Sequence, residues 1–123
     1  MESLESAAVL VADSSGVIRY WSPGAATLFR HHDLVGETLD AIVPEDFRDK
    51  HWAGFRRAMS TGESVISGGR LNIPVRCGDG ETRAFPGTFT VLWDGHGRAV
   101  GAVAVWSERR GDEVPFSPVE SIA

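Results

Sequence analysis

Short apolar runs separated by glycine-containing turns set the pattern of the 123-residue chain. One apolar run covers residues 8–12, the polar residues 13–16 interrupt it, and residues 17–21 continue with β-branched and aromatic side chains. Two such runs joined by a turn of this composition are typical of a β-hairpin. We therefore expect two antiparallel strands in this region.

A short helix is predicted directly after the hairpin. Ser22 and Pro23 are residue types preferred at a helix N-cap and at the first helical position, and apolar residues follow at helical spacing. We expect this helix to end near His31 or His32. Residues 34–43 predict one or two further helical turns. These turns are expected to end at Pro44, because proline interrupts helical structure.

A longer helix is predicted from about residue 45 to residue 60. Its apolar side chains fall on one stripe, and most of its charged side chains lie elsewhere. The members of the stripe are Phe47, His51, Phe55, Ala58 and Met59. Because His51 is one turn from both Phe47 and Phe55, we expect its imidazole to point into the core.

Three more extended segments are predicted, at residues 64–77, 82–93 and 98–107. Glycine-rich turns at 78–80 and 94–97 separate them, and glycine tolerates the positive φ angles of tight hairpins. In the second segment, alternate side chains share one face of the strand. This face carries Phe85, Gly87, Phe89, Val91 and Trp93.

Together these elements predict an α+β fold, in which a five-stranded antiparallel sheet packs one face against short helices and one longer helix. The chain is 42% hydrophobic, and its length suffices for one core but not for two ordinary domains. We expect a single domain over residues 1–110. Residues 111–123 contain two prolines and show no periodicity, which predicts an irregular C-terminal tail.

Charge and cysteine content argue against several classes of protein. Acidic residues outnumber basic ones 17 to 12, and the basic residues are scattered, which argues against direct nucleic-acid binding. A single cysteine, Cys77, rules out an internal disulfide framework and suits the reducing cytoplasm. The apolar run 99–106 is too short to span a membrane, and an acidic N-terminus is unlike a signal peptide. We therefore expect a cytoplasmic protein that does not contact a membrane.

Several short motifs, in their order along the chain, resemble the PAS family of sensory domains over about residues 6–108. The matching stretches are residues 11–18, 25–29, 34–37, 61–63 and 76–81. The family often carries an asparagine near residues 22–24, where this chain has none. The resemblance implies the PAS fold, a ligand cavity between the sheet and the long helix, homodimerisation, and a separate signalling protein or domain that receives the output.

The long helix carries a more specific resemblance. Residues 46–51, Arg57 and residues 61–63 are similar to the haem-binding PAS domains of FixL-type oxygen sensors. This resemblance implies that His51 is the axial ligand of haem iron, that Arg57 lies near a propionate, and that Arg70 responds to bound gas. The alternative for His51 is a hydrogen-bonded histidine in the core.

Four further residues are expected to contact the ligand. By the same resemblance, Phe89 and Val91 form an apolar wall on the distal side of the haem. Phe55 lies beside His51 on the helix. Trp106 or Trp93 would stack on a planar ligand, with the small residues Gly87, Ala102 and Ala104 leaving room. The alternative for these tryptophans is that they pack the core or cover a dimer interface.

The other reactive side chains give weaker indications of a function. Cys77 would be a redox sensor only if its thiolate were stabilised, which the nearby Asp79 and Glu81 oppose. His31 and His32 are adjacent and are expected in an exposed polar loop, since neighbouring side chains on a helix diverge too far to chelate one ion. Residues 33–49 lack a cysteine, so adduct photochemistry of the kind found in flavin-binding light sensors is not expected.

Two functions remain open at this stage, and a third is disfavoured. The first is a ligand-sensing PAS domain, with haem as the leading cofactor for gas or redox sensing and a flavin or other small molecule as the alternative. The second is a cofactor-free module for interaction or dimerisation in signal transduction or transcription regulation. An enzyme, such as an isomerase that uses the sole tyrosine, Tyr20, is not expected, because the sequence shows no nucleophile beside a base.

Overall fold

One antiparallel sheet of five strands organises the protein, whose computed structural model describes residues 7–62 and 71–107. The strands lie in the order β2-β1-β5-β4-β3 across the sheet. Their bounds are Ala8–Asp13 (β1), Ile18–Trp21 (β2), Leu71–Arg76 (β3), Thr82–Trp93 (β4) and Ala99–Trp106 (β5). The predicted α+β fold with its five-stranded antiparallel sheet is therefore confirmed.

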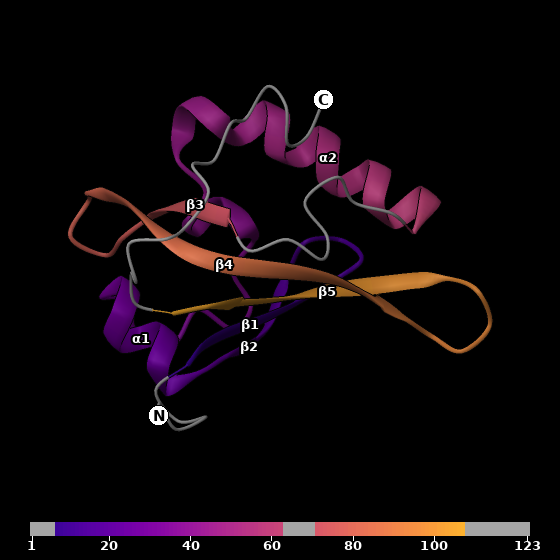
Figure 1. Ribbon diagram of the computed structural model, residues 1–123, viewed down its shortest axis with the longest axis horizontal. Coiled ribbons are helices and arrows are strands. Elements are labelled where there is room, and N and C mark those ends of the chain that lie inside the picture. The colour runs from indigo at the N-terminus through magenta and orange to yellow at the C-terminus, as the bar shows by residue number, and fades with distance from the viewer. Residues whose placement is uncertain (1–6, 63–70, 108–123) are drawn as a thin grey trace.

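Among the described residues between β2 and β3, two α-helices and two 3₁₀ turns are formed. The elements are α1 (Pro23–Phe29), η2 (Leu39–Ala41), η3 (Glu45–Phe47) and α2 (Arg48–Thr61). Figure 1 shows α2 as a separate layer over one face of the sheet, with α1 at one end of β1 and β2. None of the helices in the described part of the chain is long and apolar enough to cross a membrane.

The helix boundaries differ from those predicted. α1 ends at Phe29 because Arg30 adopts a left-handed conformation (φ 56°) and the Phe29 carbonyl accepts a hydrogen bond from the Gly78 amide at 2.8 Å. Of the predicted turns over residues 34–43, only the 3₁₀ turn η2 forms. The long helix begins at Arg48, after the 3₁₀ turn η3, since neither Pro44 nor Phe47 offers a capping side chain.

Two of the predicted segments extend beyond the described residues. The extended segment 64–77 corresponds to β3 only from residue 71 onward, since residues 63–70 lie outside the description. The predicted tail, residues 111–123, also lies outside it. The first, fourth and fifth strands follow the predicted segments closely.

Ser22 joins α1 to the start of β1. Its Oγ accepts hydrogen bonds from the amides of Ala25 (3.1 Å) and Val9 (2.8 Å) and donates one to the carbonyl of Ala7 (2.9 Å). The side chain is buried, and its bonds satisfy backbone groups at the start of both α1 and β1. The predicted N-cap is confirmed, and it also fixes the helix against the strand.

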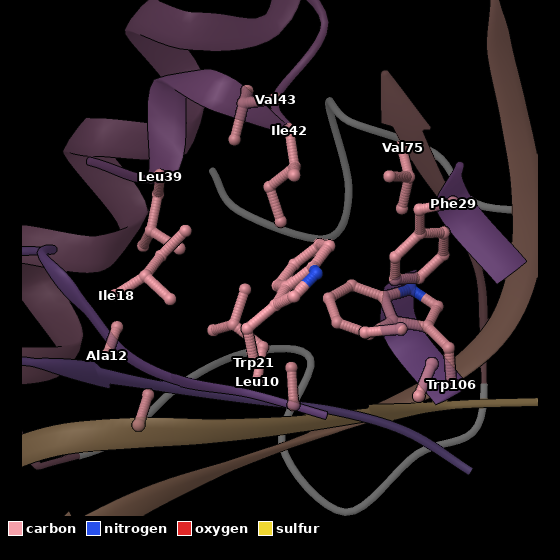
Figure 2. Packing of buried hydrophobic residues seen from close by; sticks show 14 of the residues in the cluster. Leu10, Ala12, Ile18, Trp21, Phe29, Leu39, Ile42, Val43, Val75 and Trp106 are labelled. Atoms are coloured by element: carbon pink, nitrogen blue, oxygen red, sulfur yellow. The ribbon is translucent and has the colours of Figure 1, made fainter. Parts of the chain in front are cut away.

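Phe29 lies at the centre of an aromatic group in the core, together with three other rings. Its ring is 5.8 Å from Trp21, 5.5 Å from Phe85 and 5.1 Å from Trp106, measured between centroids. The contact with Trp106 is edge to face, which is a favoured geometry for aromatic pairs. Figure 2 shows Trp21, Phe29 and Trp106 packed between α1 and the sheet, so α1 is anchored through its last residue.

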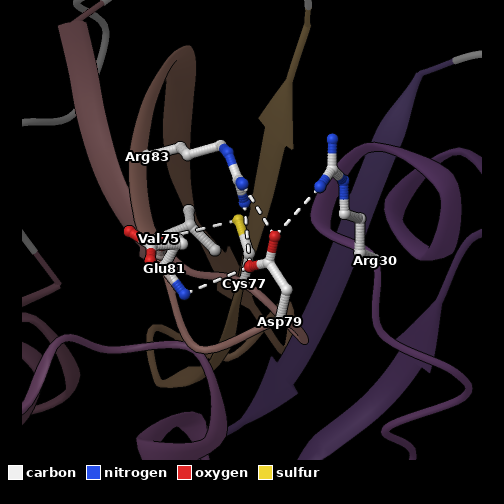
Figure 3. Close-up of polar contacts among 6 residues, drawn as sticks. All are labelled: Arg30, Val75, Cys77, Asp79, Glu81 and Arg83. Carbon is white, nitrogen blue, oxygen red and sulfur yellow. Dashed lines mark hydrogen bonds and ion pairs between the residues drawn. The ribbon is translucent and has the colours of Figure 1, made fainter.

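A charged cluster fastens the turn between β3 and β4 to the end of α1. Asp79 accepts two hydrogen bonds from Arg83, at 3.0 and 2.7 Å, and one from Arg30 at 2.9 Å. These guanidinium groups hold the pKa of Asp79 well below its usual range, the hydrogen bonds from Arg83 contributing most. Figure 3 shows the cluster, with the sulfur of Cys77 beside the carboxylate of Asp79.

Candidate functional site

An apolar pocket of about 100 Å³ lies between the inner face of the sheet and α2. Four parts of the fold supply its walls: β1 and β5, the η2–η3 segment, α2, and the edge strand β3 with its neighbour β4. The residues that define these walls are Leu10, Ala104 and Trp106; Leu39, Ile42 and Phe47; His51 and Phe55; and Ile73 and Phe89. The location agrees with the cavity predicted between sheet and long helix.

His51 is the ionisable side chain of the pocket lining. Burial lowers the pKa of its imidazole from 6.5 to about 4, although the charge of Asp40 acts in the opposite direction. The ring is therefore neutral at pH 7. Its Nδ1 is buried and has no hydrogen-bond partner. The alternative considered for this residue was a hydrogen-bonded histidine in the core. Nδ1 does not make the hydrogen bond that this alternative requires.

Two tryptophans hold α2 over the pocket, one near each end of the helix. Near its start, Trp52 donates a hydrogen bond from Nε1 to Asp40 Oδ1 at 2.7 Å, and its ring covers Gly16 so closely that a Cβ there would overlap it. At its end, the ring of Trp93 covers Gly62 in the same way. These contacts join α2 to the β1–β2 turn and to β4.

Three of the predicted ligand contacts meet in the pocket. Phe55 enters from α2, Phe89 from β4 and Trp106 from β5. The ring of Trp106 is edge-on to Phe29 in the core, so Trp106 also packs the core, which was the alternative role considered for it. The Nε1 of Trp106 is buried without a partner, and this edge of the ring lies beside Gly87. A second unpaired nitrogen thus belongs to a residue of the lining.

The remaining predicted contacts lie elsewhere. Val91 is buried in β4 next to Ala102 but does not line the pocket. Arg57 is exposed on α2, away from the lining. Arg70 lies outside the described residues. Trp93 is half exposed over Gly62 and does not face the pocket.

The pocket does not fit a haem. A volume of about 100 Å³ lies below the roughly 300–1,000 Å³ of pockets for drug-sized ligands. No described lining residue carries a cationic group for a haem propionate. The buried Nδ1 of His51 also lacks the second-shell acceptor that orients an iron-bound histidine. The haem assignment is therefore not supported by these residues.

Sequence patterns missed part of the pocket wall. Leu39 and Ile42 approach it from the η2 region, and Ile73 approaches it from β3. Leu39 and Ile42 are three residues apart, which is the spacing of one helical turn and the only local signal for them. Ile73 gave no signal that distinguishes a pocket wall from an ordinary strand.

The other reactive side chains lie outside the pocket, and two of them contact neighbouring parts of the fold. Cys77 is 2% exposed, and its Sγ contacts the Val75 carbonyl at 3.7 Å and the guanidinium of Arg83. A ring nitrogen of His31 lies 2.9 Å from the Arg76 carbonyl, so this histidine binds the neighbouring strand instead of lying free in an exposed loop. The adjacent His32 is exposed, as predicted.

Comparison with known proteins identifies relatives in sequence. A family model of the PAS fold matches residues 3–111. An uncharacterized protein of Azorhizobium caulinodans is 32% identical in an alignment of 87 residues, which covers 68% of this chain and 12% of that protein. The chain thus spans about one eighth of the length of this relative.

Solved structures agree with the sequence match. The PAS domain of a protein from Colwellia psychrerythraea superposes with a TM-score of 0.70 at 16% identity, over 85% of this chain and 86% of that one. The PAS-B domain of Drosophila melanogaster Cycle, with bound ethylene glycol, has a TM-score of 0.64 at 11% identity over 81% and 97%. The LOV domain of the blue-light photoreceptor Aureochrome1 has a TM-score of 0.62 at 24% identity over 85% and 77%. Since the family model covers most of the chain and the fold agrees, this protein belongs to the PAS fold family.

Proposed function

We propose that this PAS domain senses a small molecule that binds between the sheet and α2. The observation that carries the proposal is the apolar cavity, which lies under α2 between the contacts that Trp52 and Trp93 make near the two ends of the helix. Protein interiors are close-packed, and a space of this size has a cost in stability that a ligand would remove. His51, Phe55, Phe89 and Trp106 are the proposed contacts.

The signal leaves the pocket through α2. A ligand that presses on Phe55 or His51 shifts the helix against its contacts with Gly16 and Gly62, and both contacts lead into turns at the ends of the sheet. The receiver is a separate signalling protein or another domain of a longer chain. We place the protein in the cytoplasm, where a reduced Cys77 is stable.

A second candidate is a cofactor-free module that transmits signals through homodimerisation. The observation that favours it is the set of apolar side chains exposed on the protein surface, among them Tyr20 (48%), Val100 (42%) and Val105 (37%). Tyr20 and Val105 are on strands that pair with β1, so they belong to one sheet. In this reading the cavity has no ligand, and the sheet provides the interface.

Ligand-dependent stabilisation separates the two candidates. Melting temperatures of the wild-type protein and of an Ala104→Leu variant, whose added side chain fills the cavity, are compared against a library of small molecules that includes haemin and flavin mononucleotide. Sensing predicts compounds that raise the melting temperature of the wild type alone. The matched control is Val105→Leu, on the same strand but exposed. If no compound distinguishes wild type from Ala104→Leu, the cofactor-free module is the function.

An absorption spectrum tests the haem hypothesis directly. Protein produced with haem available is compared with a His51→Ala variant. A Soret band that disappears in the variant would establish His51 as an iron ligand and would require the pocket to open well beyond its present volume. A spectrum that contains only aromatic absorption removes haem.

A further inference from the structure

The chemistry of the pocket wall limits what the pocket can hold. Its lining consists of aliphatic and aromatic side chains together with His51, and no described lining residue carries a charge at pH 7. A charged ligand would lose its hydration without gaining an ion pair, which is strongly unfavourable. The occupant is therefore an uncharged molecule.

Two polar atoms of the lining residues lack partners. The Nδ1 of His51 and the Nε1 of Trp106 are both buried without a hydrogen bond. A buried nitrogen left unpaired costs free energy, which a hydrogen bond to a ligand atom or a water would remove. His51 is the more adaptable of the two, since neutral imidazole offers one donor and one acceptor nitrogen. Trp106 can only donate.

The volume sets an upper limit on size. An apolar cavity of roughly 150 Å³ accommodates benzene, and this pocket measures about 100 Å³. Because this pocket is the smaller of the two, its ligand is no larger than benzene, which has six non-hydrogen atoms, unless α2 moves.

Resting on the function proposed above, we propose that the ligand is an uncharged, largely apolar molecule of up to about six non-hydrogen atoms that carries one hydroxyl or carbonyl group hydrogen-bonded to His51. The class comprises short alcohols, aldehydes and ketones. Its apolar part contacts Phe55, Phe89 and Trp106.

Two molecules of nearly equal shape test the polar contact. Isobutanol and 2-methylbutane differ only by exchange of a hydroxyl for a methyl group, and isobutyrate supplies the charged analogue. Binding is followed by amide chemical shifts during titration of the full chain. Isobutanol and 2-methylbutane are expected to bind with millimolar affinity, and isobutyrate is expected not to bind.

Variants separate the polar contact from pocket shape. His51→Phe is expected to weaken isobutanol about 3- to 10-fold, the value of one hydrogen bond, and not to weaken 2-methylbutane. His51→Gln, which restores a polar group, is expected to recover most of the loss. Ala104→Leu should abolish both interactions, whereas Val105→Leu should leave both unchanged. Circular dichroism confirms that each variant is folded.

Each unexpected outcome refutes a different part of the proposal. If isobutyrate, haemin or flavin mononucleotide binds and the neutral probes do not, the proposed ligand class is wrong while small-molecule sensing stands. If isobutanol and 2-methylbutane lose affinity equally in His51→Phe, the hydrogen bond to His51 is refuted. If no probe and no library compound binds, the sensing function fails together with this inference.

Discussion

The contact between Trp52 and Gly16 yields a prediction in which two contributions can be separated. Gly16 has a positive φ of 79°, and a Cβ at this position would overlap the ring of Trp52. A side chain in the left-handed region costs roughly 1–2 kcal/mol, and overpacking costs about 1–3 kcal/mol. Gly16→Ala is therefore expected to lower the free energy of unfolding by about 2–5 kcal/mol.

Gly80 provides the matched control for the backbone contribution. Its φ is 88°, and a Cβ there meets nothing within 4 Å. Gly80→Ala is therefore expected to cost only about 1–2 kcal/mol. The difference between the two alanine variants measures the overlap with Trp52.

A double-mutant cycle isolates the same quantity. Trp52→Leu removes the ring atoms that a Cβ at position 16 would overlap, so Gly16→Ala in this background should cost only the backbone contribution. We expect a coupling free energy of about 1–3 kcal/mol. Urea unfolding followed by far-ultraviolet circular dichroism provides the measurement, since it does not depend on tryptophan fluorescence. If Gly16→Ala costs the same in both backgrounds, Trp52 does not fasten α2 to the β1–β2 turn.

Three further predictions concern pH, the cysteine and assembly. Because the pKa of His51 falls from 6.5 to about 4 on folding, the unfolded chain takes up a proton first as the pH drops. The wild type should lose about 3 kcal/mol relative to His51→Phe between pH 7 and pH 4, measured by urea unfolding; parallel curves would contradict this. Cys77 is buried, so a thiol reagent should label it slowly in the native protein and rapidly in urea, and equal rates would show that the β3–β4 turn opens readily. Val105→Asp should convert a homodimer to a monomer in light scattering, with Ser14→Asp in an exposed turn as control; a monomeric wild type would exclude the sheet interface at that concentration.

Local patterns were sufficient wherever a residue's role depends on its neighbours in sequence. The alternation in β4 and the four-residue spacing of Phe47, His51 and Phe55 predicted which side chains face inward, and the structure places all three in the pocket lining. The N-cap role of Ser22 was also local, whereas its bonds to Ala7 and Val9 were not.

Long-range contacts could not be predicted from these patterns. α1 ends early because of Gly78, which lies far along the chain. Trp52 meets Gly16 through chain closure, and nothing near either residue in sequence indicates the pairing. The size of the pocket depends on how side chains from four parts of the fold combine. A histidine motif alone therefore suggested a haem site in a space too small for haem.

The cavity also makes the protein sensitive to hydrostatic pressure. A void of about 100 Å³ per molecule corresponds to about 60 mL/mol, which is within the range of volume changes that accompany unfolding. Pressure favours states of smaller volume, so it should unfold the empty domain more readily than the Ala104→Leu variant or a domain with an occupant. The pressure at which the domain unfolds thus reports whether the cavity is filled, and this measurement requires no knowledge of what the ligand is.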